Sequence, residues 1–171
     1  NDIINKLNIS EIDEFKEYFR PEMPEEWGDD KKAWLSTTDI DKVLEQYEDA
    51  HDDFKYLGAH PIDAHKCSVS DEVCKINVSN LLKKNKKKIG IVFNTDDSSG
   101  EGEHWVSFYI DLEGVNRNGK PSAYYFDSAA DRPQKEIFKL VKKLKKQAKK
   151  EDIKLDFLYN DIQHHLYKNS V

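Results

Sequence analysis

The chain has 171 residues, a length that suits one domain with a sizeable core. Hydrophobic residues make up 37% and charged residues 35%, and no apolar run is long enough to span a bilayer, so no transmembrane helix is expected. The net charge of −6 combines an acidic first segment with a basic second segment: residues 1–72 carry 20 acidic and 8 basic side chains, and residues 73–171 carry 13 and 19.

Two helices are predicted in the N-terminal region, residues 1–50. The first begins at the N-cap Ser10 and ends before Pro21. The second begins at a capping-box-like pair, Thr38 and Asp41, and its apolar residues recur at helical spacing. Those apolar residues are Ile40, Val43, Leu44 and Tyr47.

The middle of the chain contains two predicted strands joined by a long polar loop. The segment Phe54–Asp63 is expected to be extended and to end in a turn, whereas Val73–Leu82 is compatible with a strand or a short helix. Residues 89–93 and 105–110 are rich in β-branched and aromatic residues, which favour strands. The acidic, glycine-containing loop between these two strands is expected to be a flexible lip over a cleft.

The remaining elements are a strand at 123–127, a helix that begins near Gln134, and an alternating strand at 155–160. One apolar face of the helix is expected to pack on the sheet: Ile137, Leu140, Val141, Leu144 and Ala148. This order predicts an α+β fold, with a small mixed β-sheet, a crossover helix and an N-terminal helical region. We expect a single domain over residues 1–171, divided into a helical region (1–50) and a sheet core (51–171).

Lysines crowd residues 135–150, where they surround the apolar face of the predicted helix. A solvated helix face is the preferred interpretation, with most of these lysines in solvent. The alternative is a contact with DNA, which the scarcity of arginines and aromatic residues in this segment disfavours.

The two cysteines, Cys67 and Cys74, are expected to be free thiols in a reducing compartment, because no signal-peptide pattern indicates secretion. Together with His60 and His65 they match no common zinc module, so no metal site is expected. No cofactor is expected either.

His104 and Asp127 form the strongest candidate for a catalytic pair. His104 lies where the long loop becomes a strand, and Asp127 ends the next strand. If these two strands pair antiparallel, the two side chains can meet, and a carboxylate that orients an imidazole is two thirds of a nucleophilic triad. We expect the two side chains to lie within hydrogen-bond reach or one water apart.

At these positions the chain resembles the ubiquitin-like-protease/adenain clan of cysteine peptidases, and within it the core-polyprotein proteases of large DNA viruses. The resemblance covers about residues 34–171 and rests on four segments. These are Trp34–Ile40, Phe54–Asp63 with its Pro-Ile-Asp ending, Ile91–Ser107 with His104-Trp105, and Tyr124–Ser128.

The resemblance implies a papain-like thiol endopeptidase with His104 and Asp127 as catalytic residues. It further implies that Trp105 shields the pair and offers a backbone or indole N–H near the oxyanion, that Gln163 contributes to the oxyanion hole, and that Trp34 lines the substrate cleft. The implied substrates are proteins, either viral polyproteins or ubiquitin-like tails, cleaved after small residues such as glycine. The implied location is the host cytoplasm or the virion.

The chain departs from the family pattern at the nucleophile. The family Cys follows a Gln by about six residues, but the residue six positions after Gln163 is Asn169. Tyr167–Ser170 resembles the stretch before the family Cys, so we expect a chain truncated before the nucleophile, with Leu166 at the usual Gln position. The alternative is a catalytically inactive, protease-like module that binds a ubiquitin-like or virion protein.

Overall fold

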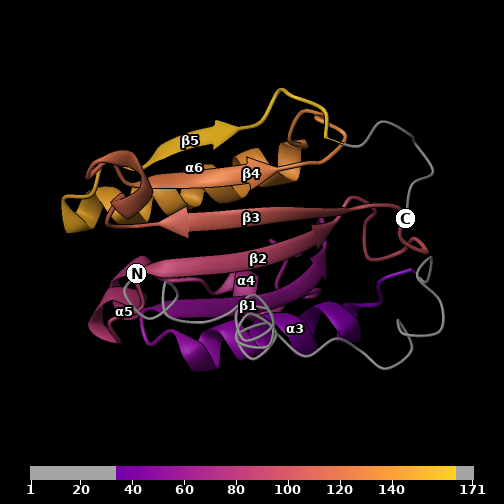
Figure 1. Ribbon diagram of the computed structural model, residues 1–171, viewed down its shortest axis with the longest axis horizontal. Coiled ribbons are helices and arrows are strands. Elements are labelled where there is room, and N and C mark those ends of the chain that lie inside the picture. Colours follow the sequence, from indigo (N-terminus) through magenta and orange to yellow (C-terminus); the bar gives the residue numbers. More distant parts are fainter. Residues whose placement is uncertain (1–33, 165–171) are drawn as a thin grey trace, which may run out of the picture. The chain divides into compact units, whose positions relative to one another are not determined.

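The computed structural model describes residues 34–164, whose elements belong to one compact unit (Figure 1). The predicted helix after Ser10 lies outside these residues, as does the segment Leu166–Ser170. The single domain over 1–171 and its division at residue 50 stay predictions.

A five-stranded mixed sheet is the centre of the fold (Figure 1). Its strands are β1 (Phe54–Pro61), β2 (Lys88–Asn94), β3 (Trp105–Asp111), β4 (Ser122–Phe126) and β5 (Asp156–Tyr159). The spatial order is β1-β2-β3-β4-β5, with β1/β2 and β4/β5 parallel and the two central pairs antiparallel. The predicted α+β class with a mixed sheet is therefore confirmed.

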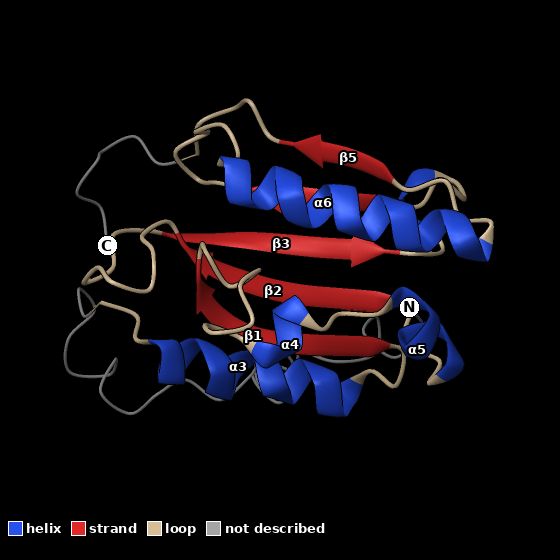
Figure 2. Ribbon diagram, turned by 180° about the vertical axis from the view of Figure 1, so that it is seen from behind, coloured by secondary structure: helices blue, strands red, loops and turns tan. Residues whose placement is uncertain are grey.

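Each parallel pair requires a crossover connection, and helices supply both. Helix α6 (Lys135–Ala148) joins β4 to β5, as the sequence predicts, while α4 (Asp71–Cys74) and α5 (Val78–Lys83) join β1 to β2. The undecided segment Val73–Leu82 is thus helical. Figure 2 shows α4, α5 and α6 on the same face of the sheet.

The core lies between this face and α6. Alternate residues of β2 and β3 are buried there, as the period of a strand requires: Ile89, Ile91, Phe93, Val106, Phe108 and Ile110. All five apolar residues predicted on α6 are buried in the same cluster.

Helix α3 (Thr37–Ala50) starts two residues earlier than the predicted Thr38/Asp41 cap implies. The capping box is Ser36/Asp39: the Asp39 N–H donates to Ser36 Oγ at 3.2 Å, and the Ser36 N–H donates to Asp39 Oδ2 at 2.9 Å. Both pairs have the same spacing, so the sequence pattern alone could not separate them.

Side chains of α3 occupy the hydrogen-bonding edge of β1. Glu48 accepts from the Tyr56 N–H at 2.9 Å, and Asp41 accepts from the Ala59 N–H at 3.0 Å and from the Tyr56 hydroxyl at 2.8 Å. Burial, followed by the hydrogen bond to Asp41, raises the pKa of Tyr56. Carboxylates therefore satisfy N–H donors that an unprotected edge strand would expose.

Candidate active site

The sheet register brings His104 and Asp127 together. Strand β3 pairs antiparallel with β2, and the Thr95 N–H donates to the His104 carbonyl at 2.8 Å, so the pairing extends to His104. On its other side β3 pairs antiparallel with β4, where Ser107 lies opposite Phe126. The residue before β3 and the residue after β4 therefore lie at the same end of the sheet.

His104 Nε2 lies 2.8 Å from Asp127 Oδ1, so the expected hydrogen bond is present. The imidazole is about one third exposed (34%), whereas the carboxylate is almost completely buried (1%). Because an ionised carboxylate only accepts, Nε2 must carry the hydrogen of this bond. Within residues 34–164 the other ring nitrogen, Nδ1, makes no hydrogen bond, so its lone pair remains for a proton from another group.

Asp127 is held from several sides. Its Oδ1 also accepts from the Ala129 N–H at 2.8 Å, and its backbone N–H and C=O are both bonded by the Asn160 side chain. Burial raises the pKa of the neighbouring Tyr125 hydroxyl, and the negative charges of Asp127 and Asp131 raise it further. Hydrogen bonds therefore hold both the side chain and the backbone of Asp127.

Side chains at the loop between β2 and β3 bond its backbone, and its expected role as a flexible lip stays a prediction. Asn94 Oδ1 accepts from the Asp96 N–H at 3.0 Å and from the Glu103 N–H at 2.9 Å, so it ties the two ends of the loop together. Gly102 has φ +96, and a Cβ there would lie 3.0 Å from Asn94 Nδ2, so this position requires glycine. The Asn94 bonds end one residue before His104 and fix the path of the backbone into it.

Asp63, the last residue of the Pro-Ile-Asp segment, clamps this loop from outside. Its Oδ1 accepts from the Ser98 N–H, and its Oδ2 accepts from Ser98 Oγ and Lys66 Nζ, each at 3.0 Å. Burial alone would raise the pKa of Asp63, but the hydrogen bonds from Lys66 and Ser98 outweigh it, and the pKa lies below its usual range. The clamp therefore depends on an ionised carboxylate.

Replacing Asp63 by asparagine is expected to lower the free energy of unfolding at pH 7 by about 1.5–3 kcal/mol, because hydrogen bonds to a charged group are lost. A depressed folded-state pKa stabilises the protein above the unfolded value, about 3.9, and this stabilisation disappears as the pH falls through the folded-state value. The free energies of unfolding of the wild type and of Asp63→Asn, measured in urea, should therefore become equal in acid. Asp49→Asn, an exposed change on α3, is the matched control and should have an effect below about 0.5 kcal/mol at either pH.

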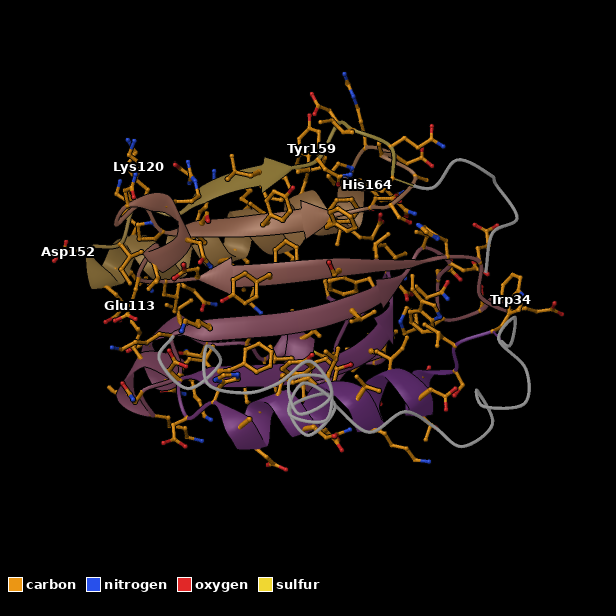
Figure 3. All side chains as sticks on the ribbon, viewed as in Figure 1. Trp34, Glu113, Lys120, Asp152, Tyr159 and His164 are labelled. Atoms are coloured by element: carbon orange, nitrogen blue, oxygen red, sulfur yellow. A yellow bond between two sulfur atoms is a disulfide. The ribbon has the colours of Figure 1, made fainter. Side chains whose placement is uncertain are left out.

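Trp105 directly follows His104 in the chain, and its indole makes a contact that differs from the expected one. The Trp105 indole N–H donates to the Leu35 carbonyl at 2.9 Å, so in this arrangement it is not available to an oxyanion. The bond ties the segment before α3 to the start of β3, where the Trp34 side chain is 72% exposed (Figure 3). The expected role of Trp34 in the substrate cleft stays a prediction.

Gln163 lies in the segment that returns from β5 toward Asp127. The next residue, His164, is labelled in Figure 3. It donates its N–H to the Ser128 carbonyl at 2.8 Å, and its ring is tilted against that of Phe126 with the centroids 5.3 Å apart. The Gln163 side chain is exposed. Its expected role in the oxyanion hole stays a prediction.

Two residues that position the site were not predicted from the sequence, namely Asp63 as the loop clamp and Asn160 as a partner of Asp127. Their contacts join residues 35 and 33 positions apart, which no local pattern reveals. The available signal was one of residue type, because an Asp or Asn directly after an apolar strand is often bonded to backbone groups nearby.

The expectation of free thiols is wrong in this structure, because Cys67 and Cys74 form a disulfide. The turns between Asp63 and α4 bring the two Cα atoms to 5.0 Å, inside the usual range for a disulfide. Between residues 34 and 164, no group of three or more His, Cys, Asp or Glu side chains is arranged to hold a metal ion. None of the helices in this range has the length and apolar character needed to cross a bilayer.

This α+β fold is similar to the folds of two proteases whose structures are solved. The crystal structure of the pS273R protease of African swine fever virus (ASFV) matches with a TM-score of 0.65 at 19% identity, over 78% of this chain and 51% of that chain. The structure of the SUMO protease Ulp1 matches with a TM-score of 0.54 at 19% identity, over 81% and 61%.

The chain belongs to the YopJ serine/threonine acetyltransferase family, whose sequence profile matches residues 9–168. It is also homologous to viral thiol proteases: the putative thiol protease R355 of Acanthamoeba polyphaga mimivirus is 33% identical over 152 residues, which is 89% of this chain and 45% of that protein. The chain thus spans about half the length of the relatives that it matches.

Proposed function

We propose that this chain carries the His–Asp portion of a cysteine endopeptidase site, with His104 as the base and Asp127 as its orienting carboxylate. The single observation that carries this proposal is the 2.8 Å bond from His104 Nε2 to the buried Asp127, which leaves Nδ1 uncommitted. Homologues that are named thiol proteases support it.

In the proposed reaction, Nδ1 of His104 takes the proton of a cysteine thiol, and Asp127 stabilises the imidazolium that forms. The thiolate attacks the scissile carbonyl, and the C–N bond breaks as the imidazolium gives its proton to the leaving amine. His104 then removes a proton from water, whose oxygen attacks the thioester carbonyl; the C–S bond breaks, the acid leaves, and the thiolate and the imidazolium are restored. The backbone N–H of Trp105 and the Gln163 amide are the proposed oxyanion donors.

The nucleophile is proposed to lie outside these 171 residues. The sequence contains two cysteines, and both are joined in the Cys67–Cys74 disulfide, which provides no thiolate. The resemblance of Tyr167–Ser170 to the stretch before the family Cys supports a nucleophile close to that point in the complete protein.

Proteins are the proposed substrates, either viral polyproteins or ubiquitin-like tails, with cleavage after a small residue such as glycine. The relatives that are named cysteine or SUMO proteases support a protein substrate. The host cytoplasm or the virion is the proposed location. The similar proteins give no support for a contact of residues 135–150 with DNA.

A second candidate function is transfer of an acyl group to a serine or threonine hydroxyl, and the family match over residues 9–168 favours it. The chemistry of the two candidates diverges only after the thioester, which water attacks in a peptidase and an acceptor hydroxyl attacks in a transferase. A third alternative is an inactive module that keeps the fold and binds a ubiquitin-like or virion protein.

These functions are separated by incubating the complete protein with three substrates: a ubiquitin-like precursor with a glycine-ended tail, a polyprotein peptide, and an acyl donor with a serine-containing protein. Cleavage of either of the first two supports the peptidase. Acylation of serine without cleavage supports the transferase. Binding of the precursor with neither reaction supports the inactive module and rejects our proposal.

The 171-residue chain by itself is expected to show no peptidase activity and no labelling by a peptide vinyl sulfone, because both of its sulfurs are in the disulfide. Intact-mass measurement after incubation with the probe tests this expectation. Labelling of Cys67 or Cys74 that disappears in His104→Ala would place the nucleophile inside this chain and overturn the proposed arrangement.

A further inference from the structure

Asn160 takes the place of a missing strand partner for Asp127. Strands β4 and β5 pair in parallel up to Tyr125 and Tyr159, and Asp127 follows the end of β4. Beyond that point the Asn160 side chain pairs with both backbone groups of Asp127: Oδ1 accepts from the Asp127 N–H at 2.9 Å, and Nδ2 donates to the Asp127 carbonyl at 2.6 Å.

The amide of Asn160 has no spare donor. Nδ2 also donates to the Ile162 carbonyl at 3.1 Å, so both of its hydrogens are used, and the residue is only 9% exposed. Its orientation is determined by its partners, because an N–H group must meet Oδ1 and the two carbonyls must meet Nδ2. Asn160 therefore fixes the backbone of Asp127, while the Ala129 N–H and the His104 imidazole bond the carboxylate of Asp127.

We propose that Asn160 is a positioning residue: by holding Asp127, it keeps neutral His104 in the tautomer with hydrogen on Nε2 and a free lone pair on Nδ1. Its consequence for catalysis rests on the proposed function, but the tautomer itself does not. Without the amide, the Asp127 backbone loses both partners on this side, and Oδ1 can move away from the imidazole.

Gln147 offers a matched control, because its side-chain amide makes the same kind of bridge at a different place. Its Oε1 accepts from the Val78 N–H at 2.8 Å, and its Nε2 donates to the Ile76 carbonyl at 3.0 Å, which ties the start of α5 and the residue before its N-cap to α6. Gln147→Ala and Asn160→Ala thus each remove one amide that bonds an N–H and a carbonyl of another segment, but only Asn160 contacts Asp127.

The test is ¹⁵N NMR of the imidazole nitrogens in the 171-residue chain, which reports the tautomer of His104 directly. In the wild type, the form with hydrogen on Nε2 should predominate. Asn160→Ala should lower the ratio of this form to the Nδ1–H form on the order of tenfold, the worth of one hydrogen bond. Gln147→Ala should leave the ratio unchanged, even if it lowers the melting temperature as much as Asn160→Ala does.

An unchanged ratio in a folded Asn160→Ala protein, or an equal change in Gln147→Ala, would overturn the proposal. If Asn160→Ala does not fold, Asn160→Ser replaces it, since a hydroxyl keeps a polar group but cannot span both backbone groups of Asp127. For Asn160→Ser, too, an unchanged ratio, or an equal change in Gln147→Ala, would overturn the proposal.

In the complete protein, Asn160→Ala should lower kcat about tenfold to a hundredfold with KM unchanged, because the base is misplaced while the substrate cleft is intact. If the complete protein has no peptidase activity, the proposed function fails, and the NMR measurement still decides the role of Asn160.

Discussion

Replacing His104 by alanine in the complete protein is expected to lower kcat for peptide cleavage about 10⁴-fold, because no other group would take the thiol proton. The described contacts support this size of effect: Asp127 orients the imidazole through Nε2, and Nδ1 is left free for the thiol. Steady-state kinetics with a peptide substrate measures the loss. Circular dichroism should show an unchanged fold, because the His104 side chain is partly exposed.

His51→Ala is the control for the His104 variant. His51 is an exposed residue at the C-terminal cap of α3, so its removal should leave kcat essentially unchanged. Full turnover in His104→Ala would show that the pair is a structural contact and not a catalytic one. Loss of turnover in both variants would point to a general effect on the protein instead.

Leu140→Ala is expected to lower the free energy of unfolding by about 2–5 kcal/mol, as buried leucines usually do. Leu140 is 2% exposed and belongs to the core cluster between α6 and the sheet, so truncation leaves a cavity that its neighbours fill only in part. Lys146→Ala, on the exposed side of the same helix, should change stability by less than about 0.5 kcal/mol. Urea unfolding of the three proteins checks both values.

Lys143 departs from the expectation that such lysines stay in solvent. Its Nζ donates to the Cys74 carbonyl, and burial lowers the pKa of its ammonium group. Lys143→Ala should therefore cost about 0.5–1.5 kcal/mol, the net value of a hydrogen bond. Equal destabilisation by Leu140→Ala and Lys146→Ala would show that the buried face of α6 is wrongly assigned.

Much of the fold follows from the periodicity of single segments. The apolar positions of α6 recur every three or four residues, so its buried face could be read from the sequence, and β2 and β3 were found from their runs of β-branched and aromatic residues. The sequence does not decide between a strand and a helix for Val73–Leu82, because α4 and α5 are too short to display a helical period.

The contact between His104 and Asp127 could be predicted because both residues lie at the ends of recognisable strands. A strand start and the end of the next strand meet whenever the two pair antiparallel, as β3 and β4 do. Asn160, by contrast, acts through a side chain that replaces backbone pairing, and Cys67 meets Cys74 through turns. Both depend on the path of the folded chain, which residue types alone do not specify.

The carboxylates of α3 make the two edges of the sheet differ in their ability to pair with an added strand. Asp41 and Glu48 already occupy N–H donors on the outer side of β1, so an added strand would have to displace a helix to pair there. Within residues 34–164, β5 is then the end of the sheet at which another extended chain could be joined without breaking existing bonds. Sheet extension, whether through self-association or through fusion of a designed strand, should accordingly proceed from β5 and not from β1.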